Sequence, residues 1–350
     1  MWCSGGSGGA VLVQLGNSEA VVVKPQGSAA VAETLALEVA DLVGVRVARS
    51  RVLSLEQDEY SDMYEAVLHA PTMVDGQRTF IAHMLSGPRE YVAVVEFVPG
   101  VVLQGLDGKR ALVGVESPQI FEELGRLIAL DAVLNNMDRV PALWQNDGNL
   151  TNVIVSIGDA IVGIDQQVHP IVHPEGRKTY FDTLSEFCVD AERGNADARA
   201  VKAVRDALRQ NCGFELTNRH AMQLLSGTRS VFRRIAQQHE VLVLALTTEA
   251  DAKMIKIFGN ASVEVGLARL DSMLHFLCAS VTHVAQAMQS MQADGKGTVQ
   301  PGVPAGTDED SEELESLSHN VKDLAGELEA SLLELNTAVA RSAAVPAAPA

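Results

Sequence analysis

Four polar residues next to apolar segments are of the types that phosphoryl transfer requires: Lys24, Asp138, Asn152 and Asp165. A lysine can bind phosphates, a carboxylate can orient an acceptor hydroxyl, and carboxylate and amide oxygens can hold a divalent cation. Such chemistry depends on positioning and charge neutralisation more than on covalent help. The four residues therefore indicate transfer of a phosphoryl group from ATP, with Mg²⁺ or Mn²⁺ bound by oxygen ligands.

Lys24 follows the apolar run of residues 21–23, so its ammonium group is expected at the lip of a cleft, on the α- and β-phosphates. Glu33 lies near the start of the next predicted helix and is the preferred ion-pair partner of Lys24. Glu38 on the same helix is the alternative. The competing interpretation of Glu33 is an ordinary solvated helix charge.

A glycine-rich segment, SGGSGG (residues 4–9), directly precedes the first predicted strand. Residues without bulky side chains let backbone N–H groups approach phosphate oxygens closely. The expected phosphate-contacting residues are Gly5, Gly6, Ser7, Gly8 and Gly9. The segment is not a Walker A loop, because it lacks Gly-Lys-Ser/Thr, and a flexible leader is the alternative interpretation.

The segment EFVPG (residues 96–100) ends a predicted strand at a proline and a glycine. A strand exit of this kind can serve as a hinge between two lobes, where backbone groups are free to hydrogen-bond an adenine ring. We therefore predict that Glu96 and Val98 contact the nucleotide base.

The segment from residue 130 to 167 joins a helix that ends in NNMDR (135–139), an asparagine before an apolar strand, and GIDQ (163–166) where many kinases have Asp-Phe-Gly. This order resembles the atypical kinases related to phosphoinositide 3- and 4-kinases and the HipA-type serine kinases. Within that group it is most similar to the actin-fragmin kinase catalytic domain, over roughly residues 4–290.

The resemblance implies a role for each polar residue of this segment. Asp138 would orient the acceptor hydroxyl and accept its proton, and Arg139 would brace the loop. Asn152 and Asp165 would bind the metal ion, with Asn149 as the alternative to Asn152. Fourteen residues separate Asp138 from Asn152, where common kinase loops have five, so residues 140–150 must loop out for the two side chains to meet.

The predicted fold is α+β and, by the resemblance, bilobal and protein-kinase-like. Residues 4–100 are expected to form a small antiparallel β lobe with one helix over 31–44, a hairpin turning at residues 17–18, and further strands at 46–55, 63–69, 79–83 and 91–97. Residues 101–293 are expected to form a larger, mainly helical lobe, with strands at 153–157 and 160–164 and helices that include 197–210, 218–238, 249–258 and 263–292.

The C-terminal part divides into an acidic linker (294–311), an amphipathic helix (312–342) and a disordered tail (343–350). Leucines and a valine recur at steps of three and four along the helix. The sequence leaves two interpretations open: the helix folds back on the kinase body, or residues 312–340 mediate self-association or bind another helix.

Composition excludes several classes of partner. The 350 residues carry 27 Lys and Arg against 45 Asp and Glu, a formal charge of −18. Such a surface repels nucleic acid and anionic membranes. The four cysteines lack metal-ligand spacing, and no signal peptide or spanning segment is evident. We therefore expect a cytoplasmic protein with no nucleic-acid or membrane partner.

The expected acceptor is a Ser or Thr hydroxyl of a protein. Between residues 166 and 190 only Arg177 and Lys178 are permanent cations, too few to grip an inositol phosphate on a membrane. The resemblance suggests actin as the substrate. A phosphoinositide kinase is one alternative. A nucleotide-binding pseudokinase that acts as a scaffold through residues 312–340 is the other, although none of the four polar residues is missing.

Overall fold

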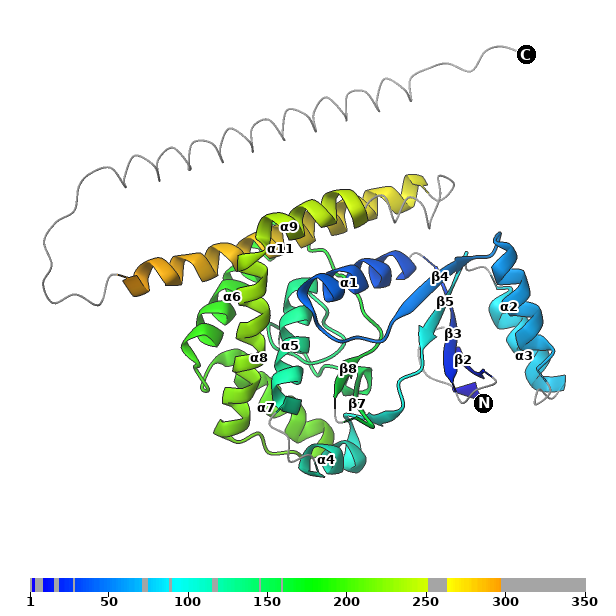
Figure 1. Cartoon of the computed structure of the whole chain (residues 1–350), viewed down its shortest axis with the longest axis horizontal. Coiled ribbons are helices and arrows are strands. Elements are labelled where there is room, and N and C mark those ends of the chain that lie inside the picture. Colours follow the sequence, from blue (N-terminus) through cyan, green and yellow to red (C-terminus); the bar gives the residue numbers. More distant parts are fainter. Residues whose placement is uncertain are drawn as a thin grey trace, which may run out of the picture. The chain divides into compact units, whose positions relative to one another are not determined.

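The computed structural model describes residues 2–3, 9–15, 19–27, 29–70, 75–87, 90–114, 119–144, 146–158, 160–250 and 263–296. Figure 1 shows their arrangement. Contacts divide the chain into residues 1–295 and 296–350, and the fold below is that of the first unit. The predicted amphipathic helix and tail, most of the predicted linker, the turn at 17–18 and residues 251–258 lie outside the described residues.

A five-stranded antiparallel sheet forms the N-terminal lobe, in the order β1-β2-β3-β5-β4. Its strands are β1 (Trp2–Cys3), β2 (Ala10–Gln14), β3 (Ala20–Gln26), β4 (Ser50–Ser54) and β5 (Tyr91–Glu96). Valine-rich runs suit such a pleated sheet. The predicted antiparallel β lobe is thus confirmed, and Lys24 lies in a central strand opposite Ala93.

Helix α1 (Ala29–Val43) packs between this sheet and the helical lobe. Leu35, Val39 and Val43 recur at helical spacing, and all three are buried in the main core. The helix ends at Gly44, whose φ of +68° suits glycine. This is the one helix that the sequence analysis predicted for the lobe.

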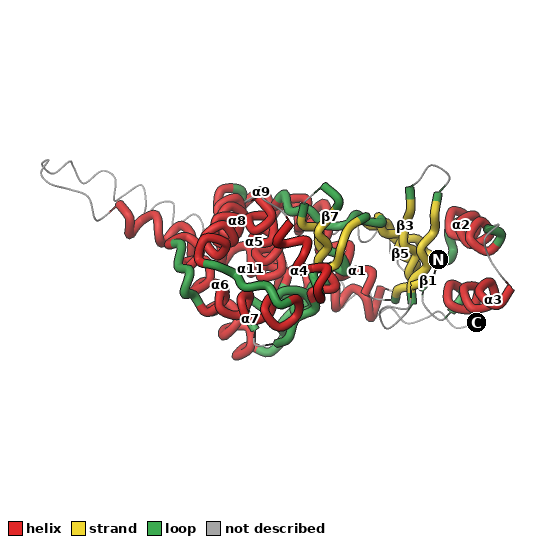
Figure 2. The backbone as a smooth tube through the Cα atoms, turned by 90° about the horizontal axis from the view of Figure 1, so that it is seen from below, coloured by secondary structure: helices red, strands yellow, loops and turns green. Residues whose placement is uncertain are grey.

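Two further helices correct that prediction: α2 (Asp58–Leu68) and α3 (Asp75–Leu85) replace the strands expected at 63–69 and 79–83. Tyr60, Met63 and Val67 follow the helical spacing of three to four residues. This spacing is not visible in a window as short as 63–69. Both helices cover the face of the sheet that points away from the helical lobe (Figure 2). A separate apolar core joins them to the sheet, formed by Val11, Val23, Leu53, Tyr60, Val67, Ile81, Leu85 and Val92.

A second, three-stranded antiparallel sheet begins directly after the hinge segment. It has the order β6-β7-β8, with β6 (Gly100–Val102), β7 (Val153–Ser156) and β8 (Ile161–Gly163). A short 3₁₀ turn (Leu150–Asn152) leads into β7. The hairpin β7–β8 therefore carries Asn152 at its entrance and Asp165 just beyond its exit.

The rest of the described chain is helical. Its elements are α4 (Gly105–Gly114), α5 (Gln119–Leu134), α6 (Pro174–Arg193), α7 (Arg199–Cys212), α8 (Asn218–Gln237), α9 (His239–Leu244), a π-helical turn (Ala245–Ala250) and α11 (Val263–Lys296). The sequence analysis did not identify α4 or α6. Helix α11 runs beyond residue 292, where its end was expected, into the segment predicted as linker.

Close packing of α5 against α8 forms the centre of this helical lobe. A Cβ atom on Gly125 would lie 1.9 Å from the Leu224 carbonyl oxygen, and one on Gly227 would lie 1.8 Å from that of Glu122. Glycine at both positions lets the two backbones touch. The end of α5, from which the Asp138 loop emerges, is therefore held rigidly. Among the described helices, none has an apolar stretch that could cross a bilayer.

Candidate active site

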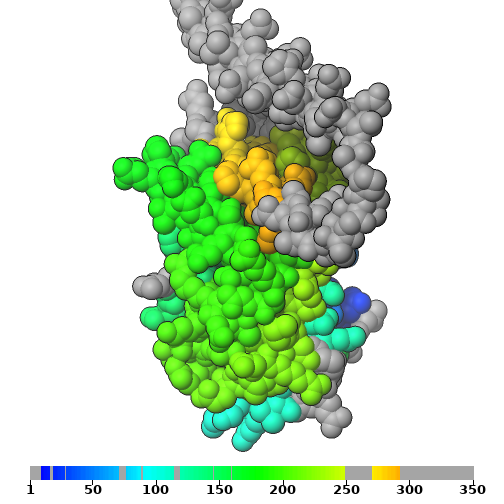
Figure 3. Space-filling view, turned by 90° about the vertical axis from the view of Figure 1, so that its left-hand side faces the viewer, coloured from blue at the N-terminus to red at the C-terminus, as the bar shows by residue number. Residues whose placement is uncertain are grey.

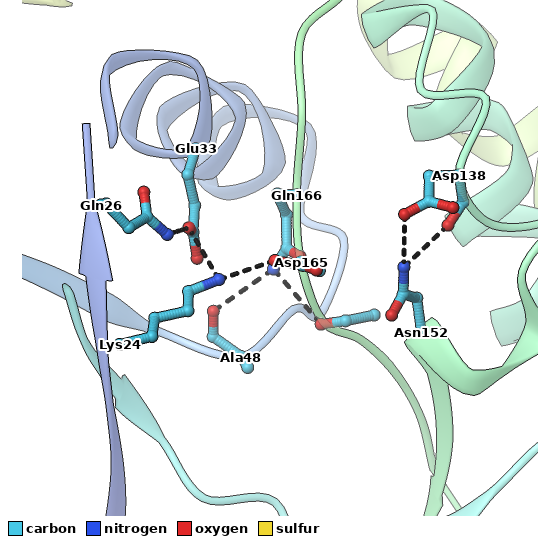
Figure 4. A network of polar contacts seen from close by, with 9 residues as sticks. Lys24, Gln26, Glu33, Ala48, Asp138, Asn152, Asp165 and Gln166 are labelled. Atoms are coloured by element: carbon cyan, nitrogen blue, oxygen red, sulfur yellow. Dashed lines mark hydrogen bonds and ion pairs between the residues drawn. The ribbon is translucent and has the colours of Figure 1, made fainter. Parts of the chain in front are cut away.

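Lys24, Glu33 and Asp165 meet in one ion-pair cluster (Figure 4). The Lys24 Nζ atom lies 3.0 Å from Glu33 Oε2 and 2.6 Å from Asp165 Oδ1. The Glu33 side chain is 5% exposed, whereas that of Asp165 is 46% exposed. The ammonium is thus held from the buried side by α1 and faces a solvent-accessible carboxylate. The structure joins Lys24 to Glu33, the partner preferred from the sequence.

Burial alone would lower the pKa of Lys24, but the negative charges of Glu33 and Asp165 and their hydrogen bonds outweigh it, so the pKa is raised. Gln26, two residues further along β3, also donates to Glu33 Oε2 at 2.5 Å. Gln26 is itself buried. The Glu33 carboxylate is therefore fixed by two side chains from one strand, which holds the Lys24 ammonium beside Asp165.

Asp165 stands in a strained and anchored segment. Its φ is +59°, in the left-handed region that aspartate tolerates better than most residues. The next residue, Gln166, is buried and donates to the carbonyl oxygens of Ala48 (3.3 Å) and Gly163 (3.2 Å). The Ala48 N–H group in turn donates to the Gly163 carbonyl. This segment thus ties the exit of β8 to the chain between α1 and β4.

Asp138 and Asn152 meet across the fourteen-residue separation noted in the sequence. The Asn152 amide nitrogen donates to the Asp138 carbonyl oxygen at 2.9 Å and to its Oδ2 atom at 3.0 Å. The amide oxygen of Asn152 lies on the side away from Asp138 (Figure 4). The alternative residue, Asn149, caps the 3₁₀ turn by accepting from the Thr151 N–H group. Its side-chain oxygen is therefore engaged within the loop.

Arg139 lies behind this loop rather than in the cleft. Its side chain is fully buried, with Nη1 3.3 Å from Asp131 Oδ1 on α5. Among the described residues, its three guanidinium nitrogens have no hydrogen-bond partner. Burial raises the pKa of Asp131 to about 7, against the opposing effects of the Arg139 charge and the Asn136 hydrogen bond. Arg139 braces the protein interior and does not face the reacting groups.

The long loop after Asp138 is fastened on both sides of that residue. Asn146 donates to the Met137 carbonyl at 2.7 Å, and the Asn149 N–H group donates to the Arg139 carbonyl at 2.7 Å. The Trp144 indole N–H donates to Asn135 Oδ1 at 2.6 Å, and its ring stacks on Tyr180. The insert is thus a defined structure whose position is fixed relative to Asp138.

The structure describes the predicted hinge fully and the glycine-rich segment only at its last residue. Glu96 accepts the Arg49 N–H group and its own N–H group donates to the Arg49 carbonyl, so it is tied to the sheet. In the described part of the chain, the Val98 N–H group has no hydrogen-bond acceptor. Of the glycine-rich segment only Gly9 is described, with a φ of +76°. Gly5, Gly6, Ser7 and Gly8 lie outside the described residues.

The residues present fit a nucleotide with a divalent cation. Asn152 Oδ1 and Asp165 Oδ2 accept no hydrogen bond from the described residues, and both are hard oxygen donors. No cluster of three His, Cys, Asp or Glu side chains occurs within the described ranges. An ion at these two residues would therefore share its remaining ligands with phosphate and water, as Mg²⁺ sites commonly do.

Sequence reasoning missed the residues that hold the site from behind: Gln26, Asp131, Asn135 and Gln166. Asp131 carried a detectable signal, because it is a single acid within the apolar run of α5 and is followed eight residues later by an arginine. The two glutamines gave no such signal. Their role depends on contacts between segments that are distant in the sequence, such as Gln166 with Ala48.

An antiparallel β lobe, a helical lobe and a Lys–Glu–Asp cluster between them define a kinase-like catalytic domain. The family described as "Actin-fragmin kinase, catalytic" matches residues 3–231. The chain therefore belongs to the actin-fragmin kinase catalytic-domain family, and the resemblance drawn from residues 130–167 is confirmed.

Two individual proteins are also similar to this chain. A Dictyostelium discoideum protein provisionally named an actin-fragmin kinase is 20% identical over 238 residues, which cover 65% of this chain and 57% of that protein. The chain thus spans little more than half the length of this relative. A solved MAP kinase from Leishmania major is 13% identical, with 88% of each chain covered and a TM-score of 0.27. At that score the superposition carries no argument about the fold.

Proposed function

We propose that this protein is an ATP-dependent protein kinase that phosphorylates a Ser or Thr hydroxyl. The observation that carries the proposal is the cluster of Lys24 with Glu33 and Asp165 beside the Asp138–Asn152 pair. Charged groups of both signs converge there from β3, α1, the α5 loop and the β7–β8 hairpin. Family membership supports the same reaction class.

Each residue has a distinct role in this proposal. Lys24 binds the α- and β-phosphates, and Glu33, fixed by Gln26, holds it in place. The Val98 N–H group donates to the adenine ring. Asp138 orients the acceptor hydroxyl and receives its proton, while Asn152 holds the Asp138 carboxylate in one rotamer. Lys24 must leave Asp165 at least partly when phosphates enter, because the two are now paired directly.

Asn152 and Asp165 are the proposed ligands of Mg²⁺ or Mn²⁺. When bound, such an ion neutralises the charge on the phosphate oxygens. The exposure of Asp165 and the unengaged amide oxygen of Asn152 suit this role. Asn149 is less suited, because its oxygen already accepts from the Thr151 N–H group.

The acceptor is proposed to be a protein rather than an inositol lipid. The two cations that follow the metal aspartate are engaged locally: Lys178 pairs with Asp182 at 2.7 Å, and Arg177 lies over the Phe181 ring. A lipid kinase needs free cations here to hold an inositol phosphate. Actin is the specific candidate, supported by the family and by the name of the Dictyostelium relative.

The test compares acceptors directly. Purified actin and phosphoinositide vesicles are each incubated with radiolabelled ATP, Mg²⁺ and either wild-type protein or the Asp165→Ala variant. We expect label in actin on Ser or Thr, and none with Asp165→Ala. Label confined to the lipid would replace this proposal by a phosphoinositide kinase. ATP binding without any turnover would indicate a pseudokinase.

A further inference from the structure

A pocket of about 520 Å³ lies between the insert after Asp138 and helix α7. The insert contributes Pro141, Trp144, Asn146 and Asp147, and α7 contributes Arg199, Lys202, Ala203, Asp206, Ala207 and Gln210. We call it the loop–α7 pocket. Figure 3 shows a face made up mostly of α6, α7 and α8, drawn in green to yellow-green. No residue of the Lys24–Asp165 cluster lines it.

The wall of the loop–α7 pocket is fixed relative to the catalytic carboxylate. Asn146 is bound to the Met137 carbonyl, one residue before Asp138. Trp144 is held by Asn135, three residues before Asp138, and by stacking on Tyr180. The pocket therefore adjoins the loop that carries Asp138.

The charge of this region is opposite to that of the protein. The chain carries −18 overall, yet residues 199–237 contain eight Lys and Arg against two acids. Asp206 in the pocket is neutralised by Arg209 at 2.6 Å. Arg199 and Lys202 are both exposed, and neither forms an ion pair within the described part of the chain. Two cations that form no ion pair with the described residues thus line the pocket.

Nearby carboxylates limit this positive charge without cancelling it. Asp147 lines the same pocket, and Glu186 and Asp190 border a smaller cavity that Arg199 also lines. Asp190 accepts a hydrogen bond from Asn195 instead. Lys202 lines the loop–α7 pocket and not the smaller cavity, so Glu186 and Asp190 share a cavity with Arg199 alone of the two cations.

We propose that the loop–α7 pocket binds an acidic segment of the protein substrate next to the phosphorylated residue. Arg199 and Lys202 pair with Glu or Asp side chains, and the half-buried Trp144 ring packs against their aliphatic stems. The word substrate rests on the proposed kinase function, but binding of an acidic peptide does not. The pocket thus selects acceptors with acidic flanks in a protein whose remaining surface repels them.

Trp144 provides a direct probe, because the sequence has two tryptophans and Trp2→Phe leaves only the one in the pocket. The Trp2→Phe protein is titrated, without ATP, with acetyl-Glu-Glu-Ser-Glu-Glu-amide and with the same peptide carrying Gln in place of Glu. We expect a saturable fluorescence change with the acidic peptide. Binding of the Gln peptide should be at least about tenfold weaker, because it cannot form the ion pairs with Arg199 and Lys202, each of which contributes modestly.

Charge reversal distinguishes the pocket from bulk charge. Arg199→Glu with Lys202→Glu is expected to weaken binding of the acidic peptide about tenfold or more. Lys178→Glu with Arg193→Glu makes the same charge change on α6, outside the pocket, and should alter binding less than about threefold. No saturable signal, or equal weakening in both variants, overturns the proposal. ATP turnover, measured in parallel without peptide, tests the kinase function separately.

Discussion

Above pH of about 7, where Asp131 is ionised, replacing Asp131 by alanine leaves the guanidinium of Arg139 buried without a counter-charge. The Arg139 side chain is fully buried, and the described residues offer it no hydrogen bond to replace the 3.3 Å ion pair. Removing one member of a buried pair costs about 3–5 kcal/mol of unfolding free energy. For a domain of this size, that loss lowers the melting temperature on the order of 10 °C.

A double-mutant cycle separates this effect from simple loss of packing. Asp131→Ala, Arg139→Met and the combined variant are each unfolded by heat and by urea. Since the combined variant has no unpaired charge, we expect it to be more stable than Asp131→Ala alone. Additive losses, or a cost of Asp131→Ala below about 1 kcal/mol, would refute the account of Arg139 as a buried, singly paired cation.

The same residue predicts a pH dependence of stability. Burial raises the pKa of Asp131 to about 7, above its value of about 3.9 in an unfolded chain. The folded protein therefore binds the proton more tightly, and this contribution is complete below pH of about 4 and lost as pH rises through about 7. Between pH 5 and 8 the wild type should lose stability that Asp131→Asn does not. Parallel pH profiles of the two proteins would contradict the shift.

Three other changes give sharp expectations. Gly163→Ala should destabilise the fold by about 1–3 kcal/mol in urea unfolding, because its Cβ atom would lie 2.3 Å from Arg139 Nη1. Glu33→Gln should lower kcat/KM for ATP about tenfold or more while the melting temperature changes little, since Lys24 loses its buried anchor. The ion pairs that raise the pKa of Lys24 stabilise the fold fully below pH of about 10.4, and this stabilisation is lost as pH rises further. Lys24→Met should therefore be less stable than the wild type below that pH, and the difference should shrink in the alkaline range.

The sequence predicted which polar residues follow apolar segments, and the structure brings Lys24, Glu33 and Asp165 together. Asp165 could be placed because it follows an apolar strand. Lys24 was expected at a strand end, but β3 continues to Gln26, so its position comes from the pairing of β3 with β5. The sequence could say only that residues 140–150 must loop out if Asp138 and Asn152 are to meet. Whether the two side chains do meet depends on how that loop folds. Asn146 and Trp144 fix the conformation of that loop through side-chain hydrogen bonds. The pattern of apolar residues along the sequence does not predict such bonds.

The N-terminal lobe shows where local patterns mislead. The segment 63–69 contains aromatic and β-branched residues in a short window, which favours a strand locally. In the structure Tyr60 and Val67 of α2 pack with Ile81 of α3 on the outer face of the sheet. The helical spacing becomes visible only over the whole of Asp58–Leu68. Packing against the apolar face of the sheet favours the helix over the strand that the local residues suggest.

Transfer of label from ATP by matched aspartate variants tests the central claim most directly. Wild-type protein, Asp138→Asn and Asp182→Asn are compared for phosphorylation of the same protein acceptor, with the melting temperature of each as a check of folding. Asp182 is an exposed residue of α6 paired with Lys178, and it serves as the matched control. We predict that Asp138→Asn loses at least about a hundredfold in kcat, within the range expected for general base catalysis, while Asp182→Asn retains the wild-type rate. Equal rates for Asp138→Asn and the wild type would contradict the assignment of this cleft as the phosphoryl-transfer site.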